Sequence, residues 1–142
     1  MIQAKLFYLL ACTFYWLWSA AIVAVSLIPS AGIGTAEFGN IEFRIDYPLH
    51  AIAFFPLPLS AWITCNYRSS SPSVCFAGMI AISIILAIGT EFMQIMVPGR
   101  SFNVMDIISN ILGIILGLSL ALAYAGKRTW KYRPERTTER ER

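Results

Sequence analysis

Charged residues are scarce over most of this 142-residue chain, which contains 11 Lys and Arg residues and 8 Asp and Glu residues. Ten of these charges lie within residues 127–142, so only nine remain for the first 126 residues. Soluble domains carry about 25% charged residues, and nine charges cannot cover a water-facing surface of this size. With 57% hydrophobic residues, the chain is also far from the composition of a disordered protein. The scarcity excludes a soluble enzyme and favours a small integral membrane protein.

Four apolar stretches are long enough, or nearly long enough, to cross a bilayer as helices. A helix needs about 20 residues to span a hydrocarbon core of about 30 Å. The second stretch is marginal, and the first is longer than the apolar region of a signal peptide. Long unbroken apolar runs favour helices over the alternating strands of a barrel. The predicted fold is therefore an all-α bundle of four transmembrane helices in one domain (1–126), followed by a basic tail (127–142) with a disordered end. The predicted spans cover residues 6–28, 48–65, 73–96 and 106–126.

The basic residues predict how the spans are oriented. The side that holds both ends of the chain carries nine of them, namely Lys5, Arg68 and seven in the tail. The other side carries Arg44 and Arg100 alone. Loops rich in Lys and Arg stay in the cytoplasm, so both termini are predicted to be cytoplasmic and the loop over 32–46 is predicted to face outward. The tail is expected to contact anionic membrane lipid, and nothing in it resembles a folded nucleic-acid-binding domain.

The three cysteines have no spacing typical of a metal site. Cys65 and Cys75 are predicted at the cytoplasmic ends of the second and third spans, and Cys12 in the inner half of the first. Because thiols stay reduced in the cytoplasm, we predict that all three are small apolar packing residues. The sequence predicts neither a resident metal nor a cofactor.

Polar residues from three spans are predicted at similar depth in the outer leaflet. Glu91 lies five residues before Met96, which places it about 7–8 Å below the boundary at the helical rise. Within a span the spacings place these residues on one face, because they are three or four apart. Such residues are costly in a membrane and usually mark function. We predict a polar pocket between spans two, three and four that opens outward. Its candidate ligand-binding residues are Asp46, His50, Glu91, Gln94, Arg100, Asp106 and Asn110.

Several of these residues also have purely structural interpretations. Asp106 follows Asn103 by three residues and is placed to complete a capping box. Arg100 is placed to meet lipid phosphates, and His50 to bond a neighbouring helix. Glu91 needs a cation or several donors, for which Arg100 and His50 are the available partners, so a structural ion pair between helices is one interpretation. The aromatic residues at 14–16 and 18 are assigned to lipid contact or helix packing, and Pro56 is expected to kink the second span.

These residues resemble the conserved pattern of the VanZ-like family. The chain matches its E-x-x-Q, P-x-R and D-x-x-x-N-x-x-G-x-x-x-G motifs, and it resembles a D-K-x-x-H motif with Tyr47 in place of the lysine. The two glycines form a small-xxx-small pattern that permits close helix packing. The resemblance implies a small protein of the bacterial-type plasma membrane, in a family named for teicoplanin resistance. The matching residues are Asp46, His50, Glu91, Gln94, Pro98, Arg100, Asp106, Asn110, Gly113 and Gly117.

Three functions fit this sequence. The first is a cell-envelope protein whose pocket binds a lipid or glycan phosphate headgroup, such as that of a cell-wall precursor, and so alters envelope properties or glycopeptide susceptibility. The second is an enzyme on a lipid-linked substrate, with Glu91, Asp106 and His50 as acid, base or metal ligands. The third is a structural or partner-binding subunit in which the polar layer joins helices. A transporter is disfavoured, because no charge lies at the midplane and four spans leave little room for inverted repeats.

Overall fold

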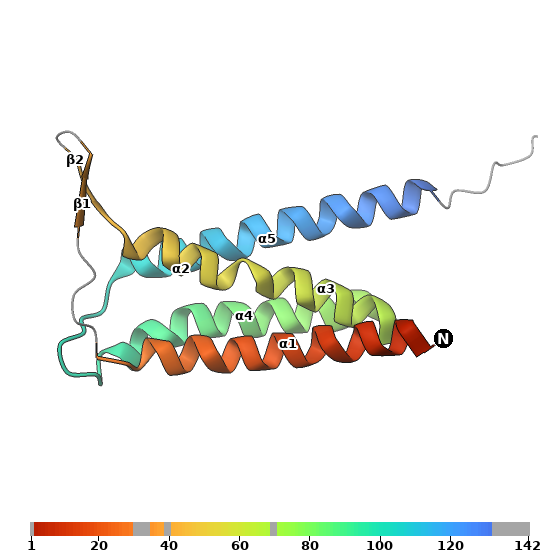
Figure 1. Cartoon of the computed structure of the whole chain (residues 1–142), viewed down its shortest axis with the longest axis horizontal. Helices are drawn as coiled ribbons and strands as arrows, with labels where there is room; N and C mark the ends of the chain where they lie inside the picture. Colours follow the sequence, from red (N-terminus) through yellow and green to blue (C-terminus); the bar gives the residue numbers. More distant parts are fainter. Residues whose placement is uncertain (1, 30–34, 39–40, 69–70, 132–142) are drawn as a thin grey trace, which may run out of the picture.

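A computed structural model describes residues 2–29, 35–38, 41–68 and 71–131 of the chain. Its helices build an elongated bundle (Figure 1). Four segments are long and apolar enough to cross a membrane, which confirms the predicted all-α fold with four spans. The helices are α1 (Ile2–Ser26), α2 (Asp46–Phe54), α3 (Pro56–Arg68), α4 (Pro72–Gln94) and α5 (Val104–Lys131).

The second span is broken into α2 and α3 at Phe55. Proline has no backbone N–H, so Pro56 and Pro58 cannot donate the helical bonds that their positions would otherwise make. Phe55 still donates to the Ala51 carbonyl at 3.0 Å, so the interruption is local. The predicted kink is confirmed. The span also begins earlier than predicted, at Asp46, which therefore lies in the first turn of α2.

Two glycines let α5 approach the broken span closely. A Cβ atom at Gly113 would lie 2.2 Å from the Ala51 carbonyl oxygen, and one at Gly117 would lie 2.2 Å from that of Phe55. Any larger residue would force the helices apart. The small-xxx-small prediction is therefore confirmed, and the close contact sets α5 against α2 near the bundle end where α5 begins.

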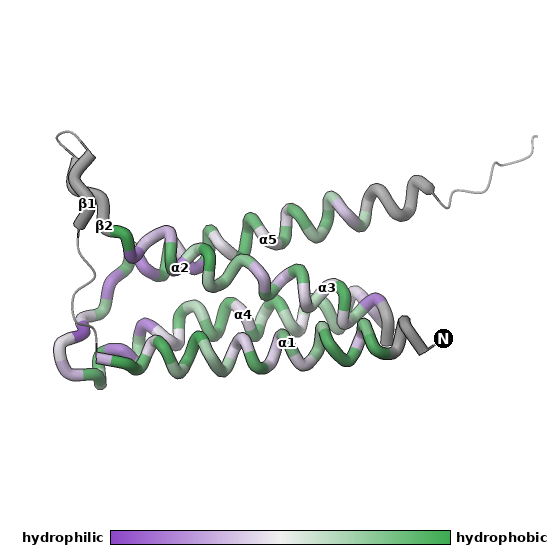
Figure 2. Tube along the Cα trace, viewed as in Figure 1, coloured by the Kyte–Doolittle hydropathy of each residue, from purple (hydrophilic) through white to green (hydrophobic). Residues whose placement is uncertain are grey.

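The outer surface of the bundle is apolar. Long side chains such as Leu17, Ile85 and Leu116 are more than half exposed. Hydrophobic residues make up most of the length of the helices (Figure 2). The small core lies where the helices meet, around Tyr15, whose hydroxyl donates to the Met79 carbonyl at 2.6 Å. An apolar exterior around a compact polar interior suits a lipid environment.

A β-hairpin occupies part of the connection between α1 and α2, where the sequence predicts loop. Strand β1 (Thr35–Phe38) pairs antiparallel with β2 (Ile41–Arg44), with Thr35 opposite Arg44. The expectation of an unstructured loop is therefore wrong over these strands. Two residues, Gly39-Asn40, separate the strands in the sequence, and a connection of this length and composition favours a hairpin. The rest of the predicted loop, at 30–34 and 39–40, lies outside the described residues.

The cysteine prediction is also wrong for two of the three residues. Cys65 near the end of α3 and Cys75 near the start of α4 form a disulfide, with their Cα atoms 5.6 Å apart. The short connection between these helices holds the two side chains against each other. Cys12 is free, as expected. In the tail, α5 continues to Lys131, and residues 132–142 lie outside the described residues.

Candidate binding cavity

A cavity of about 720 Å³ lies at the bundle end where α2 and α5 begin and α4 ends. This volume is within the usual range for small-molecule sites. Part of the lining is polar and comes from α2, α4, the connection between α4 and α5, and the first turn of α5. These residues include Asp46, His50, Gln94, Arg100, Ser101, Asn103 and Asp106. The apolar part comes largely from α1 and α2, and includes Trp18, Ala21, Ile22, Val25, Leu49, Ala53 and Phe54.

His50 is held by a chain of hydrogen bonds that joins three helices. The Asn110 amide nitrogen donates to the Ala87 carbonyl of α4 at 3.2 Å, which turns the amide oxygen toward His50. His50 Nδ1 lies 2.9 Å from that oxygen. Because an amide oxygen only accepts, Nδ1 is the protonated nitrogen, and in the neutral ring Nε2 carries the lone pair. The contact therefore fixes both the orientation and the tautomer of His50.

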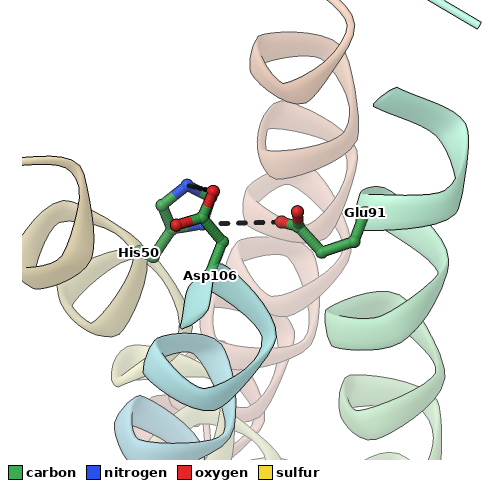
Figure 3. Close-up of side chains that lie close together, drawn as sticks. All are labelled: His50, Glu91 and Asp106. Atoms are coloured by element: carbon green, nitrogen blue, oxygen red, sulfur yellow. Dashed lines mark ion pairs between the residues drawn. The ribbon is translucent and has the colours of Figure 1, made fainter. Parts of the chain in front are cut away.

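Two carboxylates flank this imidazole, one from α4 and one from α5 (Figure 3). Glu91 Oε1 lies 3.9 Å from Nδ1, and Asp106 Oδ2 lies 3.7 Å from Nε2. The three residues come from α2, α4 and α5, as the depth argument predicts. One oxygen or nitrogen from each lies within 4.8 Å of the others. The arrangement places two carboxyl groups around one imidazole ring.

The two carboxylate oxygens of Asp106 have different neighbours, one at the start of α5 and the other at the His50 imidazole. Its Oδ1 accepts a hydrogen bond from the Asn103 amide at 3.0 Å, and Asn103 Oδ1 accepts from the Met105 backbone N–H at 3.0 Å. Asn103 thus caps the helix, and Asp106 lies in the first turn, where the helix dipole favours a negative charge. The structural role expected for Asp106 is present, although the side chain bonds the Asn103 amide rather than its backbone. Oδ2 remains directed at His50.

Glu91 is fully buried, and neither of its oxygens has a hydrogen-bond partner among the described residues. The amide nitrogen of Gln94, one turn along α4, is also buried and without a partner in the described part of the chain. Buried polar atoms are nearly always paired, so two such side chains at one site are an anomaly. The described residues of the polar cluster therefore leave the Glu91 oxygens and the Gln94 amide nitrogen without hydrogen bonds.

Arg100 is placed by a tight turn between α4 and α5. Its N–H donates to the Val97 carbonyl at 3.1 Å, and Gly99 adopts a φ of +79°, a conformation that glycine takes without strain. The guanidinium donates from Nε and Nη2 to the Ile28 carbonyl at 3.3 and 3.2 Å. Within the described residues no carboxylate lies within ion-pair distance of it. Of the two partners expected for Glu91, the structure places His50 beside it, whereas Arg100 bonds the Ile28 carbonyl just after the end of α1.

Five of the seven predicted site residues line the cavity, and the other two lie behind His50. Glu91 and Asn110 are fully buried and reach the cavity only through the imidazole. The predicted three-span pocket is wrong in one respect, because α1 also lines the cavity. Trp18 contributes there and donates from Nε1 to the Ala53 carbonyl at 2.7 Å. The signal was the spacing of Tyr15, Trp18 and Ile22, which places them on one helical face.

Four apolar spans that enclose a partly polar cavity define a multi-pass integral membrane protein. The chain matches the family model described as VanZ/LLP1 over residues 5–125, which is most of its length, and it belongs to that family. It is 31% identical over 119 residues to a fission yeast protein (Schizosaccharomyces pombe) named uncharacterized protein C11E3.10, covering 82% of this chain and 70% of the yeast protein. No solved structure matches the chain. The similarity therefore extends to a eukaryotic protein.

Proposed function

We propose that the protein binds the phosphate-bearing headgroup of a membrane lipid or lipid-linked glycan in the cavity at the start of α2 and α5. The observation that carries this proposal is Arg100, which lines the cavity and is the one Lys or Arg residue among the described lining residues. Planar guanidinium groups bind phosphate through paired N–H groups and are the usual partners of phosphate in proteins.

The donors at the cavity favour an anionic ligand. Arg100 uses Nε and Nη2 on the Ile28 carbonyl, so both N–H groups of Nη1 are uncommitted within the described residues. The Gln94 amide nitrogen, which also lines the cavity, has no partner there either. A phosphate oxygen offers acceptors to both groups. The backbone turn at Gly99 holds Arg100 in place before the ligand arrives, which reduces the entropy lost on binding.

The opposite wall favours a ligand with an acyl chain. The α1 side of the cavity is formed by Trp18, Ala21, Ile22 and Val25, which present mostly apolar surface. A soluble phosphate would leave this wall unused, whereas a lipid places its headgroup at the polar residues and its chain along α1. The proposal therefore commits to an amphipathic phosphate compound rather than to a free anion.

Native mass spectrometry of the purified chain tests this proposal with phosphatidylglycerol as the probe and diacylglycerol of the same chains as the phosphate-free control. We expect Arg100→Gln to weaken phosphatidylglycerol binding about 10- to 100-fold, since a charge-assisted hydrogen bond contributes about 1.5–3 kcal/mol. Lys5→Gln removes the same charge at the other end of the bundle and should bind as wild type does. Equal binding of both lipids, or no effect of Arg100→Gln, contradicts the proposal.

We further propose that the cavity faces outward from a bacterial-type plasma membrane, with both termini in the cytoplasm. The support is the distribution of basic residues, nine on the side of the termini and two on the other. The observation against it is the disulfide between Cys65 and Cys75, which lies on the side of the termini, where a cytoplasmic location would keep thiols reduced. A site on the outward face would meet cell-wall precursors and, through them, influence susceptibility to teicoplanin-type antibiotics. Loss of the gene with no change in teicoplanin susceptibility would contradict that last step.

An enzyme acting on a lipid-linked substrate is the second candidate. The observation in its favour is His50, which lies between two carboxylates at 3.9 and 3.7 Å and lines the cavity. Such a group can relay a proton to or from a bound substrate. Turnover of lipid-linked substrate by purified protein, abolished by Glu91→Gln without loss of lipid binding, would favour this function over binding alone.

The same contacts favour a third candidate, a structural membrane subunit, because the hydrogen bonds of Asn110 join α2, α4 and α5. In that case Asn110→Ala would lower stability and expression, while Arg100→Gln would leave both phenotype and lipid binding unchanged.

A further inference from the structure

One potential ligand atom from each of His50, Glu91 and Asp106 lies within 4.8 Å of the others at the edge of the cavity (Figure 3). We propose that these three residues bind a divalent transition-metal ion. The sequence analysis predicts no resident metal and names these residues as metal ligands only within its enzyme alternative, and the present inference does not depend on headgroup binding. Clustered acidic residues alone would not carry it, but two further observations at this site point to a cation.

The first observation is the state of Glu91. Its side chain is fully buried, both oxygens lack hydrogen-bond partners within the described residues, and Asp106 is 5% exposed. Two ionised carboxylates around one imidazole in a low-dielectric interior would repel each other, and burial removes their hydration. Arg100, the basic residue at the cavity, bonds the Ile28 carbonyl. A bound cation satisfies the Glu91 oxygens and compensates both charges.

The second observation is how the ligands are oriented by their neighbours. His50 donates its Nδ1–H to Asn110, which leaves the Nε2 lone pair directed to the side of Asp106 Oδ2, 3.7 Å away. Metal-binding histidines almost always donate their other N–H in this way, and metal-binding carboxylates are themselves hydrogen-bonded. Asp106 Oδ1 meets the second condition through Asn103. The supports expected around a metal site therefore come from α5 and from Asn103, the residue that caps it.

The distances are close to those of a coordinated ion. Zinc lies about 2.0–2.2 Å from nitrogen and carboxylate ligands, so ligand atoms around one ion are at most about 4.4 Å apart. The separation of 3.7 Å between Nε2 and Oδ2 fits this limit. Glu91 Oε1 lies 3.9 Å from Nδ1, on the other ring nitrogen, so binding includes a rotation of the Glu91 side chain, while the bond between His50 and Asn110 is kept.

The donor set also indicates which ions fit. One imidazole with two carboxylates suits Zn²⁺ or Mn²⁺ better than Ca²⁺ or Mg²⁺, which prefer oxygen ligands alone. Three protein ligands leave at least one coordination position for water or for an oxygen of a bound compound. Because His50 and Asp106 line the cavity, that position is reached from the cavity.

Metal analysis of the tag-free chain in non-ionic detergent, without added phospholipid, tests the proposal. The protein is stripped with EDTA, incubated with Zn²⁺ in the presence of a competing chelator, and analysed by mass spectrometry of the metal. We expect about one Zn²⁺ per chain, and affinity at least tenfold lower in Glu91→Gln and Asp106→Asn. Glu42→Gln is the matched control, because Glu42 lies in strand β2 and is none of the three proposed ligands, and it should retain Zn²⁺.

A spectroscopic measurement covers the case in which the variants fail to fold. Co²⁺ added to the stripped wild-type chain should give visible absorption bands that Zn²⁺ abolishes. Absence of these bands, or equal Zn²⁺ binding by wild type and Glu91→Gln, overturns the proposal. Phosphatidylglycerol binding is measured separately, with and without EDTA. A chain that binds Zn²⁺ but not the lipid refutes headgroup binding alone, and one that binds the lipid without Zn²⁺ refutes the metal site alone.

Discussion

The contact between α5 and α2 makes Gly113→Ala a sensitive probe of how the cavity is assembled. An added Cβ would lie 2.2 Å from the Ala51 carbonyl oxygen, about 1 Å inside the closest approach of such atoms. The obstacle is backbone rather than a flexible side chain, so the helices must separate. Overpacking of this kind costs about 1–3 kcal/mol. Separation would also lengthen the 2.9 Å contact between His50 and Asn110, which lies one turn away on α5.

A matched control isolates this clash from the intrinsic preference of alanine for helices. Gly89 in α4 has nothing within 4 Å of an added Cβ, so Gly89→Ala should stabilise the chain by about 1 kcal/mol. Gly113→Ala gains the same helical preference, and the difference between the two variants therefore measures the clash. We expect Gly113→Ala to unfold at lower denaturant than Gly89→Ala by about 1–3 kcal/mol, measured by SDS titration followed by circular dichroism. Equal stability of the two variants would refute the close packing of α5 on α2.

Two further predictions concern the ends of the bundle. The first tests the proposed orientation, in a chain whose native cysteines are replaced. Ser101→Cys should react with an impermeant thiol reagent in intact cells and Ser73→Cys only after permeabilisation, because these exposed positions lie at opposite ends of the bundle. The reverse pattern would place the cavity in the cytoplasm. Reduction of the bond between Cys65 and Cys75 should lower the free energy of unfolding by about 2–3 kcal/mol, because the bond closes a short loop. Thermal unfolding with and without reductant measures this loss of stability. Cys65→Ser is the control, because reductant should not change its unfolding midpoint. An unchanged midpoint in the wild type would contradict the prediction.

The transmembrane architecture was predictable because helix length and membrane thickness leave few alternatives. Counting residues from the ends of the spans placed His50, Glu91 and Asp106 at one depth, and the structure brings them together. Depth does not determine how each helix is rotated about its axis. For that reason nothing in the residue spacing predicts that Arg100 bonds Ile28 rather than approaching Glu91.

The part that α1 plays in the cavity and the disulfide were not predictable, for different physical reasons. The other site residues are recognised by their charge or polarity, whereas the face of α1 that carries Trp18 and lines the cavity is uncharged. The pairing of Cys65 with Cys75 depends on the facing sides of α3 and α4, which the spacing of the cysteines does not determine. The hypothesis that they are separate packing residues relied on the expected compartment rather than on their geometry.

The position of the disulfide makes the two ends of the bundle mechanically unequal. A covalent bond ties the end of α3 to the start of α4, far along the bundle from the cavity. At the cavity end, the chain relies on exchangeable contacts, such as those of Asn110 and Arg100. The bundle is therefore tied by a covalent bond at one end and held by hydrogen bonds at the other. Small changes in the angle between α1 and α2 would alter the width of the cavity while the disulfide keeps the far end of the bundle together.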